Sequence, residues 1–307
     1  MRYSLIATSG LLATAYGHGL VTNIKGANGV VMPGLSVADG TPRDCTTNRC
    51  GSQADTAIIR DREIASGKAS ALGRTQGNGP IDAAVMIQNF MGTGAAPTNN
   101  GSAASTGVED DIPGNVAKKS TLLPRGLGDL LSGLTGGRAG GNKAKTGQGS
   151  KSETPQETFV AATAGQGSTS GLPTCADDGS ITMTFRQINQ DGAGPIEAAV
   201  DGTSGGKDPD AFKTAEVTQD VPGVGFLGLS AATNTDFPLT VKMPEGMTCD
   251  ATVGDAQNVC IVRVRNNAIA GPFGGSAAFT QSPAARKRAV AYRLKKRNSV
   301  QQNRRLR

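Results

Sequence analysis

The 307-residue chain contains no tryptophan, only three tyrosines and eight phenylalanines, and a single histidine. One imidazole and no C-x-x-C spacing argue against a structural zinc site. The chain also lacks the G-x-S-x-G pattern of serine hydrolases, and a nucleophilic serine would have only this one histidine as its base. Long stretches of helical periodicity are missing too. We therefore expect neither a zinc protein nor a Ser–His hydrolase, and we assign no catalytic residue.

Apolar residues form a long run only near the N-terminus. Arg2 precedes a mostly apolar or small stretch from Leu5 to Ala15, and Ala15-Tyr16-Gly17 offers the small residues of a cleavage site. This pattern is typical of a secretory signal peptide and is too short for a membrane span. We expect residues 1–17 to be removed and the protein to be secreted, either extracellular or at the cell surface, with no transmembrane span. Cleavage there would make His18 the first residue.

Negative charge is absent from the end of the chain. Residues 283–307 hold ten Lys or Arg and no acidic residue. Without these ten and Arg2, 20 of the 31 cations remain against 25 acidic residues, so residues 18–282 carry a net charge of −5. The basic composition therefore predicts no nucleic-acid surface on the folded part. We expect 283–307 to be a disordered basic tail, with the dibasic pairs Lys287-Arg288 and Lys296-Arg297 open to secretory proteases.

Glycine is abundant, with 43 residues, and it concentrates in one internal segment. Residues 92–157 are largely polar, glycine-rich and of low complexity. Such a composition buries too little apolar area to offset the entropy of ordering, which predicts a disordered insertion. Asn100-Gly101-Ser102 within it is a glycosylation sequon, compatible with an exposed position in a secreted protein.

The two remaining segments, 18–91 and 158–282, carry the folding signal. Apolar and polar residues alternate in SITMTFRQI (180–188), FPLTVKM (237–243) and VCIVRVRN (259–266). Period-two alternation indicates half-buried antiparallel strands, and the turn clusters between them favour a sandwich. Leu20–Ile24 reads as a further strand and Pro80–Met91 as a helix. We predict an all-β fold, an antiparallel β-sandwich with long loops, assembled from both segments.

Five cysteines are present, and the oxidising secretory route favours disulfides. We expect Cys45–Cys50 to close a tight loop and Cys249–Cys260 to close a second short loop. Spacing alone leaves other pairings open. Cys175 is then left over, either free and buried or paired in another arrangement.

Two patterns raise the question of a cofactor. GVGFLG (223–228) matches G-x-G-x-x-G, but Pro222 and Pro238 leave no strand-to-helix context, so a glycine-rich turn explains it better. The start HGLV resembles the copper-dependent lytic polysaccharide monooxygenases, which are β-sandwiches that hold copper with an N-terminal histidine and a second histidine. This chain has no second histidine, and Asp191 could complete only a weaker site with His18. We therefore expect no cofactor, with copper as the alternative.

Four longer stretches carry a more specific resemblance: HGLVTNIKGANG, SVADGTPRDCTTNRCGSQADTAIIRDREI, CADDGSITMTFRQINQDGAGP and VCIVRVRNNAIAGPFGG. Together they resemble the fungal Egh-type secreted proteins associated with appressoria and host penetration, often called cell-surface virulence factors. The resemblance covers both folded segments and implies a secreted fungal protein active around penetration, without an established catalytic set. We expect it to bind fungal, plant or insect cell-wall polysaccharide or a host surface. The alternative function is copper-dependent oxidation of polysaccharide.

Overall fold

The computed structural model describes residues 18–46, 50–98, 145–152, 154–190, 192–223, 230–268 and 271–305. The expected signal peptide, the sequon at Asn100, Asp191 and most of the glycine-rich GVGFLG stretch lie outside these residues. The strands are β1 (Gly19–Lys25), β2 (Val31–Pro33), β3 (Ala57–Ile58), β4 (Arg74–Thr75), β5 (Gly79–Pro80), β6 (Lys145–Thr146), β7 (Ser150–Lys151), β8 (Ser180–Gln187), β9 (Glu197–Asp201), β10 (Lys213–Asp220), β11 (Thr235–Lys242), β12 (Ala251–Val253), β13 (Ala256–Arg265) and β14 (Phe273–Thr280). The helices are α1 (Asp61–Ala65), α2 (Ala83–Met91), α4 (Phe159–Thr163), α5 (Gly167–Ser170), the 3₁₀ turn η3 (Pro209–Ala211) and α6 (Pro283–Arg305).

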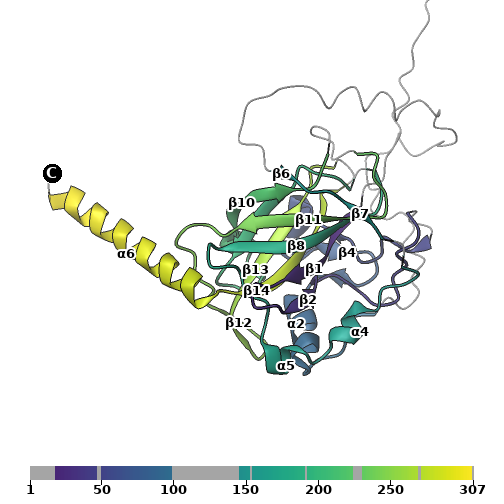
Figure 1. Ribbon diagram of the computed structural model, residues 1–307, viewed down its shortest axis with the longest axis horizontal. Helices are drawn as coiled ribbons and strands as arrows, with labels where there is room; N and C mark the ends of the chain where they lie inside the picture. The colour runs from purple at the N-terminus through teal and green to yellow at the C-terminus, as the bar shows by residue number, and fades with distance from the viewer. Residues whose placement is uncertain are drawn as a thin grey trace, which may run out of the picture.

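The strands form one sheet, whose main path runs β2-β1-β8-β11-β10-β9-β13-β14-β3-β4-β5, and β12 pairs with β13 off this path. Figure 1 shows β10, β11 and β8 side by side in it. Every pairing along this order is antiparallel, which confirms the predicted all-β class. Three strands match the alternating stretches directly. β8 buries Ile181 and Met183, β11 buries Leu239 and Val241, and β13 buries Val262 and Val264. The alternation follows because one side of each strand meets the core.

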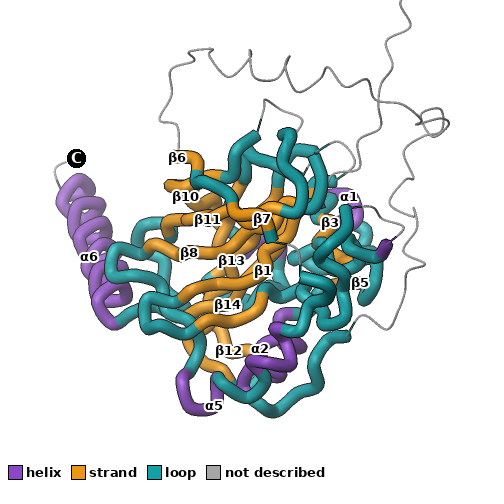
Figure 2. Tube along the Cα trace, turned by 45° about the vertical axis from the view of Figure 1, so that its right-hand side comes forward, coloured by secondary structure: helices purple, strands orange, loops and turns teal. Residues whose placement is uncertain are grey.

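The two layers of the fold belong to this single curled sheet. The first part of β10 pairs with β9, at Lys213–Ala215, and its later part pairs with β11, at Glu216–Gln219. This eight-residue strand therefore runs from one layer into the other. The sheet bends round until β1 lies against β14, where a Cβ on Gly275 would come within 2.7 Å of the Val21 nitrogen. Figure 2 shows the resulting half-barrel, with α2 and α5 at one end.

Part of the segment expected to be a disordered insertion joins this sheet. Strand β6 pairs parallel with the end of β10, and β7 pairs with the start of β11. Glu157 forms an ion pair with Arg43 at 3.0 Å. Composition did not predict this order because these short strands gain their stability from backbone hydrogen bonds to existing strands, not from their own apolar residues.

A buried group of ion pairs ties the first folded segment to the second. Arg43 contacts both oxygens of Asp55, at 3.0 and 2.5 Å, and Arg186 pairs with Asp236 at 3.1 Å. The Arg186 guanidinium also donates to the Arg43 carbonyl oxygen. Burial lowers the pKa of Arg43, but the charges and hydrogen bonds of Asp55 and Glu157 outweigh it and leave that pKa above its ordinary value. Residues far apart in the chain thus share one buried charge network.

The basic segment after residue 282 is helical over Pro283–Arg305, where irregular chain was expected. Proline suits the first turn of a helix, and the Ser282 hydroxyl accepts a hydrogen bond from the Ala285 amide at 3.1 Å. Alanine, arginine and lysine then favour the helical conformation. Ala285 and Ala289 are buried against the body, and the C-terminal part of α6 projects away from it (Figure 1). Within the described part of the chain, none of the helices has the length and apolar character needed to cross a membrane.

Candidate functional site

The only histidine of the chain lies directly before β1, inside the fold. Its side chain is buried, and its ring lies 4.3 Å from the Phe273 ring, centroid to centroid, at an interplanar angle of 32°. The His18 backbone nitrogen donates to the Asn189 side-chain oxygen at 2.6 Å, and the Ile188 amide donates to the His18 carbonyl at 2.9 Å. Both the ring and the backbone of His18 are therefore held by the body.

Two glycines allow this close packing. A Cβ on Gly192 would lie 2.2 Å from the His18 carbonyl oxygen, and a Cβ on Gly19 would lie 2.6 Å from the Phe185 ring. Contacts this short are incompatible with any larger residue unless the backbone moves. Close packing around His18 therefore requires glycine at both Gly19 and Gly192.

Neutral amide side chains surround this region. The Gln187 side-chain nitrogen donates to the Asn189 and Ala232 carbonyls and to the Ser230 hydroxyl, at 2.8 to 3.0 Å. The Asn266 oxygen accepts from the Phe273 amide at 3.0 Å, and its nitrogen donates to the Ala193 carbonyl at 3.3 Å. These amides fix the loops that meet at His18. The periodic pattern of the sequence did not identify them, because amides in turns are common and only the fold brings these together.

The donors at His18 do not fit the copper site of the monooxygenases that the N-terminus resembles. The described residues offer one imidazole, the nitrogen of the same residue and an amide oxygen, and no second imidazole exists in the chain. Among the described residues, no group of three His, Cys, Asp or Glu side chains could hold a metal ion. Asp191 lies outside the described residues, so the expected pairing with His18 stays a prediction. Copper prefers nitrogen ligands to oxygen ligands of this kind, so this donor set is a poor one.

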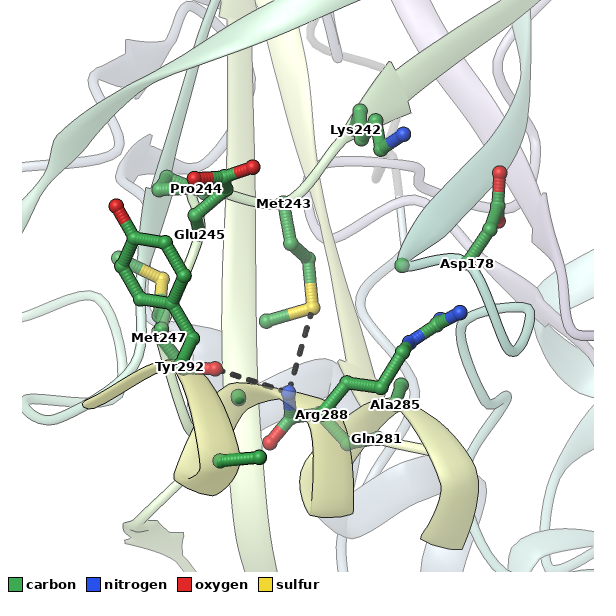
Figure 3. Close-up of a pocket in the computed structure, with 14 residues that line it drawn as sticks. Asp178, Lys242, Met243, Pro244, Glu245, Met247, Gln281, Ala285, Arg288 and Tyr292 are labelled. Atoms are coloured by element: carbon green, nitrogen blue, oxygen red, sulfur yellow. Dashed lines mark hydrogen bonds between the residues drawn. The ribbon is translucent and has the colours of Figure 1, made fainter. Parts of the chain in front are cut away.

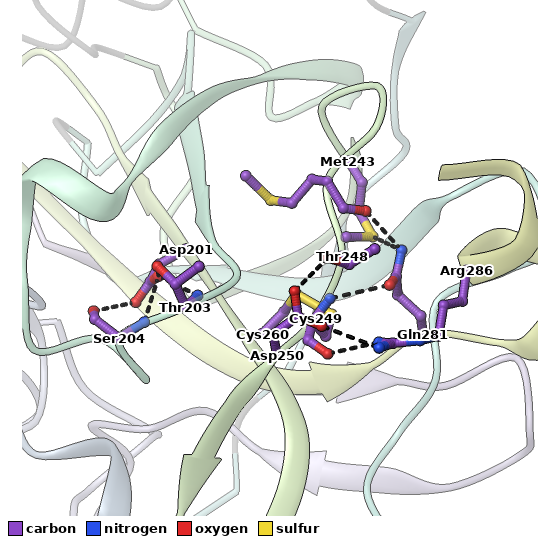
Figure 4. Close-up of a disulfide and its surroundings, with 11 residues drawn as sticks. Asp201, Thr203, Ser204, Met243, Thr248, Cys249, Asp250, Cys260, Gln281 and Arg286 are labelled. Atoms are coloured by element: carbon purple, nitrogen blue, oxygen red, sulfur yellow. Dashed lines mark hydrogen bonds and ion pairs between the residues drawn. A yellow bond between two sulfur atoms is a disulfide. The ribbon is translucent and has the colours of Figure 1, made fainter. Parts of the chain in front are cut away.

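Both expected disulfides are present. Cys45 is bonded to Cys50 and Cys249 to Cys260, and Cys175 is a free, buried thiol whose pKa is raised by burial. Figure 4 shows that the Cys249–Cys260 bridge lies beside the start of α6. There, Arg286 donates to the Cys249 carbonyl at 2.9 Å and pairs with Asp250 at 3.1 Å. The second bridge thus anchors the base of the projecting helix.

Three of the four stretches that carry the family resemblance converge on this region. The first supplies His18, the third supplies Gln187 and Asn189, and the fourth supplies Asn266 and Phe273. A profile of the Egh16-like virulence factor family matches residues 16–274. The chain belongs to the Egh16-like virulence factor family. The match ends before α6 begins.

Individual relatives agree with the family. The chain is 52% identical, over 299 residues, to the appressoria-specific virulence factor GAS2 of Pyricularia oryzae, which covers 97% of this chain and 95% of that protein. It is 38% identical to the appressoria-specific virulence factor GAS1 of the same fungus over 131 residues, 41% of this chain and 51% of that protein. No solved structure matches the chain.

Proposed function

We propose that the protein is an extracellular fungal virulence protein that acts by binding a cell-wall polymer or a host surface and not by catalysis. Its family and the similarity to two appressoria-specific virulence factors support a role around host penetration. The two disulfides support export, because disulfides persist in oxidising compartments.

The burial of His18 is the observation that carries the choice of binding over catalysis. A general base or metal ligand has to reach its substrate or its ion. The His18 ring instead packs on Phe273 within the fold, and its backbone is hydrogen-bonded on both sides. The arrangement favours a structural role, in which His18 holds the start of β1 against the loops that follow β8 and β13.

Retention on insoluble polymers tests the proposal. Purified protein with its mature N-terminus verified by mass spectrometry is mixed with chitin, cellulose, β-glucan and pectate, with and without a chelator. We expect retention on at least one polymer, unchanged by the chelator, and no release of sugars. Absence of retention on every polymer would contradict wall binding, and sugar release would contradict a non-catalytic role.

Copper-dependent oxidation is the second candidate, and one observation favours it. The His18 nitrogen and ring belong to one residue, and cleavage after Gly17 would convert that nitrogen into a free amine capable of chelation with the ring. Copper titration of the processed protein beside the His18→Ala variant separates the candidates. If the protein acts by binding a polymer without catalysis, copper should bind weakly, and equally so, to the wild-type protein and to the His18→Ala variant. Tight one-to-one binding lost in the variant, with peroxide-dependent release of oxidised sugars, would favour the enzyme.

A further inference from the structure

A groove lies between the base of α6 and the turn that follows β11. It has a volume of about 410 Å³, and its walls include Asp178, Lys242, Glu245, Arg288 and Tyr292 (Figure 3). The four charged side chains are exposed, and the Tyr292 ring is 40% exposed. An amphipathic aromatic ring beside charged groups, in a concave site, is a common arrangement for binding a polar ligand with an apolar face.

The walls of this groove are fixed by contacts with the body. Gly246 has a φ of +76°, and a Cβ there would come within 2.9 Å of the Tyr292 ring, so the turn and the ring pack closely. The Arg293 guanidinium donates to the Gly246 carbonyl at 2.5 Å. The Gln281 side chain donates to the Met247 carbonyl and accepts from the Cys249 amide, each at 3.0 Å. A pre-formed site loses less entropy when it binds a ligand.

Two cations reach the groove from different elements. Lys242 comes from the end of β11, and Arg288 from α6. Hydrogen bonds from Ser180 lower the pKa of Asp178, and the charges of Lys242 and Arg288 add to that effect. Figure 3 shows Lys242 and Arg288 on the same side of the groove as Asp178, away from Tyr292. On the other side of the groove, the nearby Glu245 carboxylate raises the pKa of Tyr292.

The positive charge continues along α6 beyond the groove. Arg293, Lys295, Lys296 and Arg297 follow Tyr292, all are exposed, and no acidic residue lies between 283 and 307. Among the α6 cations whose side chains are described, only Arg286 forms an ion pair with the body. The body has the opposite net charge, so α6 is a strongly cationic extension of an acidic domain.

The distribution of charge around α6 favours a soluble polyanion over a membrane surface. Lys295, Lys296 and Arg297 are consecutive and so point in directions about 100° apart on a helix of 3.6 residues per turn. A helix that lies on a membrane separates a broad apolar face from its cations. On α6 the exposed apolar side chains Val290 and Leu294 are flanked by cations. A flexible anionic chain can contact cations on several sides, releasing counterions as it does.

We propose that the groove and α6 together bind a carboxylated polysaccharide, with a sugar ring against Tyr292 and carboxylates on the cations from Lys242 to Arg297. This inference rests on the proposed function and names the polymer class that it would bind. The polymer chain would run outward along α6, and the groove would hold one of its sugar units.

Binding of polygalacturonate to the full chain tests the inference, with neutral galactan as the comparison. The test variant is Lys295→Gln with Lys296→Gln and Arg297→Gln. Its matched control removes three exposed cations of the body, Lys25→Gln with Lys68→Gln and Lys207→Gln. Both variants change the net charge equally. Mass spectrometry confirms that the C-terminus is intact, and circular dichroism confirms folding.

We expect polygalacturonate affinity to fall by about tenfold or more in the α6 triple variant and by less than about twofold in the control, with wild-type binding weakening as salt rises. Tyr292→Ala should weaken binding with little change in the salt dependence. Equal losses in the two triple variants, equal binding to galactan, or stronger binding to DNA or to vesicles of anionic lipid would each overturn the inference. Retention on chitin or glucan without polygalacturonate binding would overturn this inference alone, whereas retention on no polymer would also contradict the proposed function.

Discussion

Arginine serves different purposes in the β body and on the projecting helix. Arg43 and Arg186 are about 2% exposed. Arg43 is held by the carboxylates of Asp55 and Glu157. Arg186 is held by the Asp236 carboxylate and by the carbonyl oxygens of Arg43 and Ser152. Arg297 and its neighbours on α6 are exposed and form no ion pair among the described residues. Burying a guanidinium without a partner would cost folding free energy, so each buried arginine of the body is held in one geometry by its partners. The exposed cations of α6 have no such constraint and are free to meet a partner.

The largest expected effect comes from breaking the buried network. Arg43→Met leaves the Asp55 carboxylate buried without its main partner and removes the ion pair of Glu157. We expect the free energy of unfolding to fall by about 3–5 kcal/mol, measured by urea denaturation. The matched control is Arg297→Met on α6, with an expected change below about 0.5 kcal/mol. A loss of less than 1 kcal/mol in Arg43→Met would show that buried and exposed arginines contribute alike.

The next effect tests the disulfide at the junction of the two regions. Cys249→Ser with Cys260→Ser removes a crosslink between residues 11 apart in sequence, and chain entropy predicts a loss of about 3 kcal/mol. The variant should also weaken polygalacturonate binding, because Cys249 and Asp250 hold Arg286 at the base of α6. Unchanged binding in a folded variant would show that the groove does not depend on this bridge. Cys45→Ser with Cys50→Ser is the control, and it should leave binding unaffected.

A smaller effect is expected from a single buried carboxylate. Burial raises the pKa of Asp201, but hydrogen bonds from Ser204, Thr203 and Gly206 outweigh it and leave the pKa below its ordinary value. A carboxylate of this kind contributes stability above its unfolded pKa and loses it as the pH falls. Asp201→Asn should therefore cost about 1–2 kcal/mol at pH 7. The difference should shrink as the pH falls below about 4, measured by thermal unfolding across pH. A difference that does not change with pH would contradict this account.

Sequence reasoning succeeded where the signal was local. Alternation identified β8, β11 and β13 because one face of each strand meets the core. Cysteine spacing favoured both disulfides because each closes a short loop.

It did not anticipate features that depend on distant partners. Nothing near Arg43 indicates Glu157, which lies more than 100 residues away, and nothing near His18 indicates Phe273. The order of β6 and β7 comes from the edges of β10 and β11. Alanine, lysine and arginine favour the helical state of α6 locally, but the high charge of the segment led to a prediction of disorder. The metal pairing of His18 with Asp191 remains a prediction.

The smallest effect on stability should come from the distal cations of α6. Lys295→Gln with Lys296→Gln and Arg297→Gln removes no ion pair, and the three side chains are solvated, so the free energy of unfolding should change by less than about 0.5 kcal/mol. Neutralising neighbouring like charges could even stabilise the helix slightly, since like charges close together on a helix repel. Urea denaturation of this variant beside wild type measures the effect. A loss above about 1 kcal/mol would mean that the distal half of α6 contributes to folding. Its cations would then stabilise the fold, as the buried arginines of the body do. An unchanged stability together with lost polymer binding would assign this half of the helix to recognition alone.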